Sequence, residues 1–129
     1  METADYYADL VIHNYIYKGP TVERTVRRNL KKHGNYRDMI SQLKKHSRVL
    51  IENCGYGELP LLLSLVYKNM SVVATESDTD KLELAANCAS VPSNLQYVGF
   101  VDEEIGGFDC VVRVKSAEGH IETVSREVN

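Results

Sequence analysis

One segment constrains the fold more than any other, because a strand, a glycine turn, a helix, a strand and an acid follow one another in it. The first strand, Val49-Leu50-Ile51, ends in the turn-rich Asn53-Cys54-Gly55-Tyr56-Gly57. A helix predicted over residues 58–68 is apolar on nearly all sides, which indicates burial against a sheet. The second strand covers residues 71–75 and ends at Glu76. This order is typical of a βαβ unit, in which a right-handed crossover joins two parallel strands.

The same rhythm continues towards the C-terminus. Asp78 is placed to cap a helix over residues 79–89, and further strands are predicted at 95–101 and 108–114. Strands that alternate with helices at this spacing predict an α/β fold with a mainly parallel sheet. We expect a truncated Rossmann-like sheet of four to five strands, ordered third, second, first, fourth, with helices 58–68 and 79–89 on its faces.

The chain is predicted to be a single domain over residues 1–129, with three parts of different texture. Residues 1–46 read as a helical lead-in, residues 47–115 as the Rossmann-like core, and residues 116–129 as a hairpin strand or tail. The alternation in His120–Val124 is that of an edge strand.

Three helices are predicted in the lead-in. The first covers about residues 3–17, where apolar side chains recur at spacings of three and four. Thr21 is the predicted N-cap of the second helix, which Gly34 ends. Asn35 is the predicted cap of the third helix.

Composition excludes several protein classes. The longest uninterrupted apolar run, Leu61–Leu63, is far shorter than the roughly 20 residues of a transmembrane helix. The first ten residues are acidic and lack the features of a secretory signal. Three scattered cysteines form neither a disulfide framework nor a zinc motif. We therefore expect a cytoplasmic protein with free thiols, whose cysteines are Cys54, Cys88 and Cys110.

Charge is distributed unevenly along the chain. Residues 18–48 contain ten basic and two acidic residues, so this stretch carries +8 while the rest of the chain carries −11. Such a split suggests an anionic lipid surface or a nucleic acid as partner. Nucleic acid is the weaker alternative, because Tyr36 is the sole aromatic residue in the stretch available for base stacking. The basic helices could also simply present a solvated face or lie on the acidic body of the same chain.

The glycine turn and Glu76 together indicate a ligand site. Glycine lets a backbone approach a ligand closely, and the helix N-terminus that follows offers free N–H groups. An acid at the tip of the neighbouring strand can accept hydrogen bonds from a ribose diol. A purely structural turn would also favour glycine. A nicotinamide-dinucleotide domain fits less well, since Leu59 or Pro60 stands where its third glycine belongs.

Three segments resemble a known family, the class I S-adenosylmethionine-dependent methyltransferases. The family's first motif resembles Arg48-Val49-Leu50-Ile51-Glu52-Asn53-Cys54-Gly55-Tyr56-Gly57, and its second resembles Val72-Val73-Ala74-Thr75-Glu76-Ser77-Asp78. The segment Asn14-Tyr15-Ile16-Tyr17-Lys18-Gly19-Pro20 resembles the lead-in to a methyltransferase-like module of bacterial multidomain lipid proteins. Those proteins also carry a transporter-like region and a lysophospholipid acyltransferase region. The resemblance covers roughly residues 5–110 and implies a lipid-related role, at the cytoplasmic face of a membrane.

The resemblance also implies S-adenosylmethionine as the cofactor. Its binding residues would come from the first motif, from the end of the second strand and from the loop after the third strand. They are Glu52, Asn53, Cys54, Gly55, Tyr56, Gly57, Glu76, Ser77 and Asp102. No metal is expected, and the sequence assigns no catalytic residue.

Departures from the family pattern predict an impaired methyltransferase. The family's first motif begins with an acid, but Ile51 stands at that position. Glu52 is one position late and points to the other side of an extended strand. The family sheet has seven strands, whereas this sequence predicts four and one hairpin strand. We therefore expect methyl transfer to be incomplete or impaired.

Two alternatives do not require a cofactor. A non-catalytic interaction module could dimerise through the unfinished edge of its sheet, near residues 120–124, because exposed strand edges invite pairing. Alternatively, Cys54 could be a reactive thiol if the helix N-terminus lowered its pKa.

Overall fold

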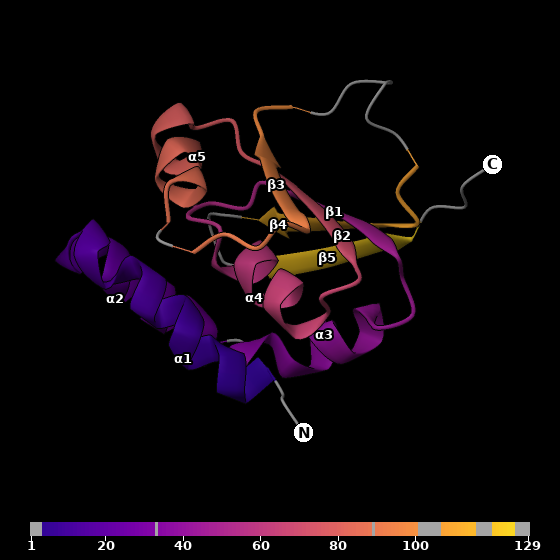
Figure 1. The fold of residues 1–129 in the computed structure, drawn as a ribbon, viewed down its shortest axis with the longest axis horizontal. Helices are drawn as coiled ribbons and strands as arrows, with labels where there is room; N and C mark the ends of the chain where they lie inside the picture. Colours follow the sequence, from indigo (N-terminus) through magenta and orange to yellow (C-terminus); the bar gives the residue numbers. More distant parts are fainter. Residues whose placement is uncertain (1–3, 33, 89, 101–106, 116–119, 126–129) are drawn as a thin grey trace.

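A five-stranded sheet forms the centre of the molecule (Figure 1). The computed structural model describes residues 4–32, 34–88, 90–100, 107–115 and 120–125. The strands lie in the order β3-β2-β1-β4-β5. Their bounds are β1 Arg48–Glu52, β2 Ser71–Thr75, β3 Leu95–Val98, β4 Cys110–Lys115 and β5 His120–Ser125.

Strand pairing confirms the predicted α/β fold and strand order. β1 pairs in parallel with β2 and with β4, so that Val49 lies opposite both Val72 and Cys110. β3 pairs in parallel with β2, and β5 is the antiparallel strand at the edge beside β4. Three consecutive residues are buried in β1 and in β2, a pattern typical of strands in parallel sheets.

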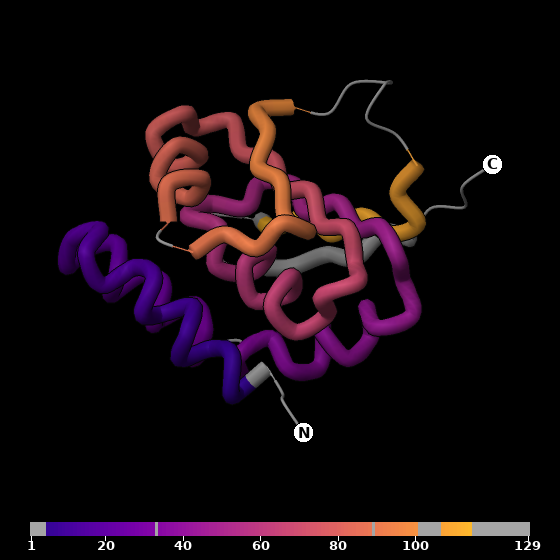
Figure 2. The backbone as a smooth tube through the Cα atoms, in the orientation of Figure 1, coloured from indigo at the N-terminus to yellow at the C-terminus, as the bar shows by residue number. Residues whose placement is uncertain are grey.

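The helices pack on one face of the sheet. Their bounds are α1 Ala4–Tyr15, η1 Ile16–Lys18, α2 Pro20–Lys32, η2 Gly34–Tyr36, α3 Arg37–Leu43, α4 Glu58–Val66 and α5 Thr79–Ala86. The N-terminal helical segment lies along one side of the molecule (Figure 2). One large core joins side chains from all five α-helices to Val49 and Ile51 of β1.

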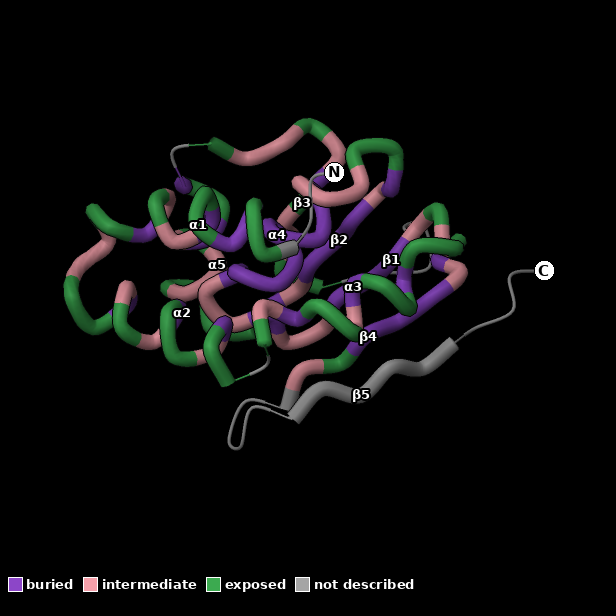
Figure 3. The backbone as a smooth tube through the Cα atoms, turned by 90° about the horizontal axis from the view of Figure 1, so that it is seen from below, coloured by how far each residue is buried: buried purple, intermediate pink, exposed green. Residues whose placement is uncertain are grey.

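The other face of the sheet carries a small separate cluster. Leu50, Val73, Val111 and Phe108 form it, and within the described part of the chain no helix contributes to it. The two crossover helices, predicted on the faces of the sheet, thus lie on the same face. The chain steps from β1 to β2 to β3 in one direction, so right-handed crossovers place both helices on one side. Figure 3, coloured by burial, shows long buried stretches in β1, β2 and β4 and exposed stretches along the helices.

Two predicted helix caps in the lead-in are wrong. α2 begins at Pro20, not after Thr21, because the carbonyl of Gly19 already accepts the N–H of Glu23 at 3.0 Å and proline suits a first helical position. Asn35 has a φ of 55°, and its Nδ2 donates to Asp5 Oδ1 at 2.9 Å. Its side chain therefore links η2 to α1 and does not cap α3.

Other local predictions are confirmed. Asp78 caps α5, because its Oδ1 accepts the backbone N–H groups of Asp80 and Lys81 at 3.0 and 3.2 Å. Gly34, with a φ of 56°, has the left-handed conformation expected after a helix. Among the described residues, no helix is long and apolar enough to span a bilayer.

Candidate functional site

The glycine turn between β1 and α4 has an unusual backbone conformation. Asn53, Gly55 and Gly57 all have positive φ angles, of 60°, 63° and 86°. Asn53 tolerates this conformation, and its Nδ2 donates to the carbonyl of Val114 at 2.6 Å. The N–H of Cys54 donates to the carbonyl of Thr75 at 2.9 Å. The turn is therefore fastened to the ends of both neighbouring strands, β2 and β4.

Glu76 connects the turn to the next crossover. Its side chain is 6% exposed. Its Oε1 accepts the N–H of Gly55 at 2.8 Å, and its Oε2 accepts the N–H of Asp78 at 2.9 Å. Hydrogen bonds to an ionised carboxylate are among the stronger ones in proteins. Glu76 thus braces the glycine turn against the start of α5.

Two tyrosines, one buried and one half-buried, support the turn from the face of the sheet that the helices cover. The hydroxyl of Tyr15, from α1, donates to the carbonyl of Tyr56. The hydroxyl of Tyr97, from β3, donates to the carbonyl of Gly57 at 3.1 Å. Burial raises the pKa of both tyrosines well above its ordinary value, which keeps both hydroxyls as donors. Sequence reasoning missed both residues, since each reaches the turn only through tertiary packing.

The structure brings most of the predicted site residues together, from Asn53 to Gly57 with Glu76. Ser77 is exposed just beyond Glu76, where β2 leads into α5. Glu52 is separated from this group, because its Oε2 accepts Arg113 Nε at 3.2 Å on the helix-free face of the sheet. Asp102 lies outside the described residues.

Cys54 is not a reactive thiol. Burial, with Glu76 and Glu58 nearby, raises its pKa to about 12. Its side chain is 4% exposed, so the thiol remains protonated and inaccessible at neutral pH. The proposed effect of the helix N-terminus is outweighed by desolvation and by two carboxyl groups. In the described part of the chain, no group of three or more histidine, cysteine or acidic side chains could hold a metal ion.

Glu58 is a buried acid that sequence reasoning missed. It is the first residue of α4 and is 5% exposed. Its Oε1 accepts Asn29 Nδ2 at 2.9 Å, whereas no hydrogen-bond donor of the described residues reaches its Oε2. Burial raises the pKa of Glu58, although the Asn29 hydrogen bond and nearby Lys81 oppose the shift.

The raised pKa predicts a pH-dependent contribution to stability. Stability from protonated Glu58 is fully present below the pKa of the unfolded chain, about 4.3, and is lost as the pH rises through the higher folded pKa. Glu58→Gln cannot titrate, so its stability relative to the natural chain should increase between about pH 4 and about pH 7. For each unit by which folding raises the pKa of Glu58, the relative stability of the variant should increase by about 1.4 kcal/mol between these two pH values. Urea denaturation at the two pH values measures it, and an unchanged difference would contradict the assignment.

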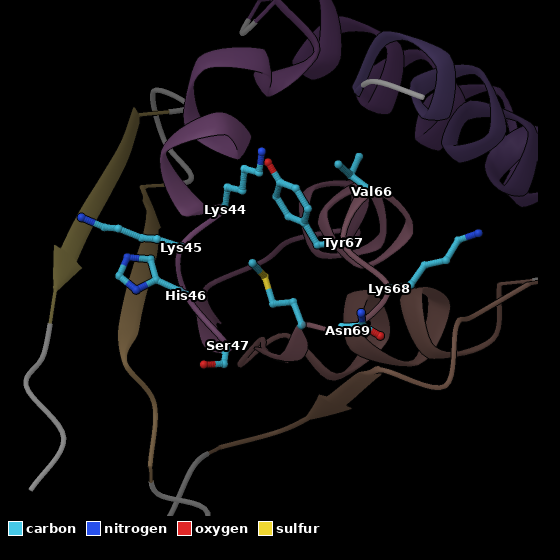
Figure 4. A pocket seen from close by; sticks show the side chains of 9 residues that line it. Lys44, Lys45, His46, Ser47, Val66, Tyr67, Lys68 and Asn69 are labelled. Carbon is cyan, nitrogen blue, oxygen red and sulfur yellow. The ribbon is translucent and has the colours of Figure 1, made fainter. Parts of the chain in front are cut away.

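A separate pocket of about 510 Å³ lies near the amino ends of β1 and β2, away from the glycine turn at their carboxyl ends (Figure 4). The segments just before β1 and β2 line it, together with the end of α4. Its lining includes Lys44, Lys45, His46 and Lys68, and Figure 4 shows the Tyr67 ring beside Lys44. Open α/β sheets bind ligands beyond the carboxyl ends of their strands, which is where the glycine turn lies and this pocket does not.

Comparison with known proteins supports the fold alone. No protein-family model matches the chain, and no curated protein matches it in sequence. Among solved structures, the StiE O-MT has a TM-score of 0.51 and 12% identity, over 79% of this chain and 39% of that chain. The plantazolicin methyltransferase BpumL in complex with SAH has a TM-score of 0.49 and 9% identity, over 86% of this chain and 60% of that chain.

The fold is therefore that of a class I methyltransferase-like, Rossmann-type domain. This chain spans less than two thirds of the length of either solved structure.

Proposed function

We propose that this domain binds S-adenosylmethionine at the glycine turn, with Glu76 as the acid that faces the ribose. The observation that carries the proposal is the pairing of Gly55 with Glu76 at the carboxyl ends of β1 and β2. This is the position at which open α/β sheets bind nucleotide-like ligands. The methyltransferase-like fold favours S-adenosylmethionine over other such ligands.

The residues of the turn suit a nucleoside ligand. A Cβ atom at Gly55 would meet nothing within 4 Å, so open space adjoins the turn there. Each carboxylate oxygen of Glu76 accepts one backbone N–H and has capacity for another hydrogen bond. Ribose hydroxyls are donors of the required kind. When bound, S-adenosylmethionine would supply the electrophilic methyl group.

Methyl transfer by this chain is proposed to be impaired. Transfer by in-line displacement depends on positioning and on a closed pocket. Ile51 is fully buried where the family motif has an acid, and Glu52 is held by Arg113 on the far face. Within the described residues no helix covers that face. We further propose a lipid-related setting, on the resemblance of residues 14–20.

Calorimetric titration tests the proposal. We expect S-adenosylmethionine and its demethylated product, S-adenosylhomocysteine, to bind, and NAD not to bind. Binding of NAD alone would contradict the assignment and favour a dinucleotide domain. Binding of none of the three would favour an interaction module, in which edge strand β5 pairs with a second copy of the chain.

A further inference from the structure

We propose that helices α1 and α2 form a docking surface for an anionic lipid bilayer. The observation behind this proposal is that α2 carries a row of exposed cations, while α1 and η1, which both contact α2, carry a row of exposed apolar side chains. Neither row contributes to the glycine turn, so binding at this surface would be a function separate from cofactor binding. Figure 3 looks onto these helices and shows exposed stretches on both.

The cations of α2 face away from the protein. Val22, Val26 and Leu30 are buried at spacings of four, which fixes the inward face of this helix. The basic side chains on the remaining surface are all exposed: Arg24, Arg27, Arg28, Lys31 and Lys32. Glu23 is the one acidic residue of α2, and Arg27 pairs with it at 3.6 Å. This helix therefore has a net positive outer face.

The apolar row lies on the neighbouring helical turns. Exposed large hydrophobic side chains are concentrated there, with Tyr17 88% exposed. The others in this segment are Tyr6 at 56%, Leu10 at 44% and Ile16 at 39%. α2 is in direct contact with both α1 and η1, so the exposed cations and the exposed apolar side chains lie on adjoining helices. Aromatic and aliphatic side chains beside cations are typical of helices that lie in a membrane interface.

Lipid suits this surface better than nucleic acid does. Leu10 and Ile16 have no ring on which a base could stack, whereas both can enter the acyl boundary of a bilayer. Two acidic side chains of α1 adjoin this surface: Asp5, which pairs with Arg37 at 3.4 Å, and Asp9, which is exposed. Lysine and arginine side chains can also rest their aliphatic stems on the bilayer while their charges reach the headgroups.

Sedimentation with lipid vesicles tests the proposal on the full chain. The chain should bind phosphatidylcholine vesicles that contain phosphatidylserine and should not bind vesicles of phosphatidylcholine alone. Arg24→Gln/Arg28→Gln should weaken binding on the order of 30-fold. Its matched control, Lys68→Gln/Arg113→Gln, removes the same charge elsewhere and should change binding little. Raising the salt concentration to about 1 M should abolish the charge-dependent part of vesicle binding, because the Debye length then falls to about 3 Å.

A second pair of variants tests the apolar row. Tyr17→Ser should weaken vesicle binding about tenfold, whereas Phe100→Ser, which removes a ring that is 73% exposed elsewhere, should leave binding unchanged. Equal losses in a variant and its control would overturn the proposal. So would the absence of phosphatidylserine-dependent binding, or binding to single-stranded RNA without binding to vesicles.

Discussion

Replacing Gly57 by alanine is expected to lower the free energy of unfolding by about 2–5 kcal/mol. The φ angle of Gly57 is 86°, a conformation that costs other residues about 1–2 kcal/mol. The new Cβ would also lie 2.8 Å from the Tyr97 hydroxyl oxygen and 2.9 Å from the Cβ of Ala85. Ala85 is fully buried and short, so it can move away only if α5 itself shifts.

Gly55→Ala is the matched control for this variant. Gly55 also has a positive φ, of 63°, but a Cβ there would meet nothing within 4 Å. Its cost is therefore the conformational part alone, about 1–2 kcal/mol. Urea denaturation of both variants measures the difference. Equal losses would show that the contact of the turn with α5 and β3 is not tight.

Glu76→Ala should cause the second large effect, a loss of about 3 kcal/mol of stability. The substitution leaves the N–H groups of Gly55 and Asp78 without their carboxylate acceptors, at 2.8 and 2.9 Å in the natural chain. It should also weaken S-adenosylmethionine binding by about 1.5–3 kcal/mol. Calorimetry at a temperature where the variant remains folded separates the binding loss from the stability loss.

Glu76→Gln keeps the shape of the side chain and gives an intermediate result. One oxygen still accepts a backbone N–H, while the amide NH₂ faces the other N–H, so the stability loss should be smaller than in Glu76→Ala. Unchanged ligand affinity in Glu76→Ala would move the binding site away from the glycine turn. Unchanged stability would mean that Glu76 does not brace the turn.

Sequence reasoning predicted the parts of the fold that depend on local pattern. Buried strands separated by crossover helices predicted the parallel order, because handedness leaves few topologies. The cap at Asp78 depends only on the N–H groups two and three residues further on. Helix ends were predicted less well: α4 ends at Val66 and α5 at Ala86, before the predicted residues 68 and 89.

The missed features depend on contacts between distant segments. Tyr15 and Tyr97 reach the glycine turn from α1 and β3, and nothing in their local sequence indicates those partners. Asn35 bonds to Asp5, thirty residues away, which overrides its preference for a helix cap. Glu58 looks like an ordinary first-turn acid until α2 brings Asn29 against it. Tertiary packing decides each of these.

The central claim is that S-adenosylmethionine binds across Gly55, Gly57 and Glu76. Two-dimensional NMR of the isotope-labelled chain during titration with S-adenosylmethionine tests this claim most directly. The largest shifts should occur at the backbone amides of these residues and of Ser77, and S-adenosylhomocysteine should shift the same amides. The largest shifts at residues 44–47 and 66–70, which line the basic pocket, would contradict the claim, and so would no shifts at all.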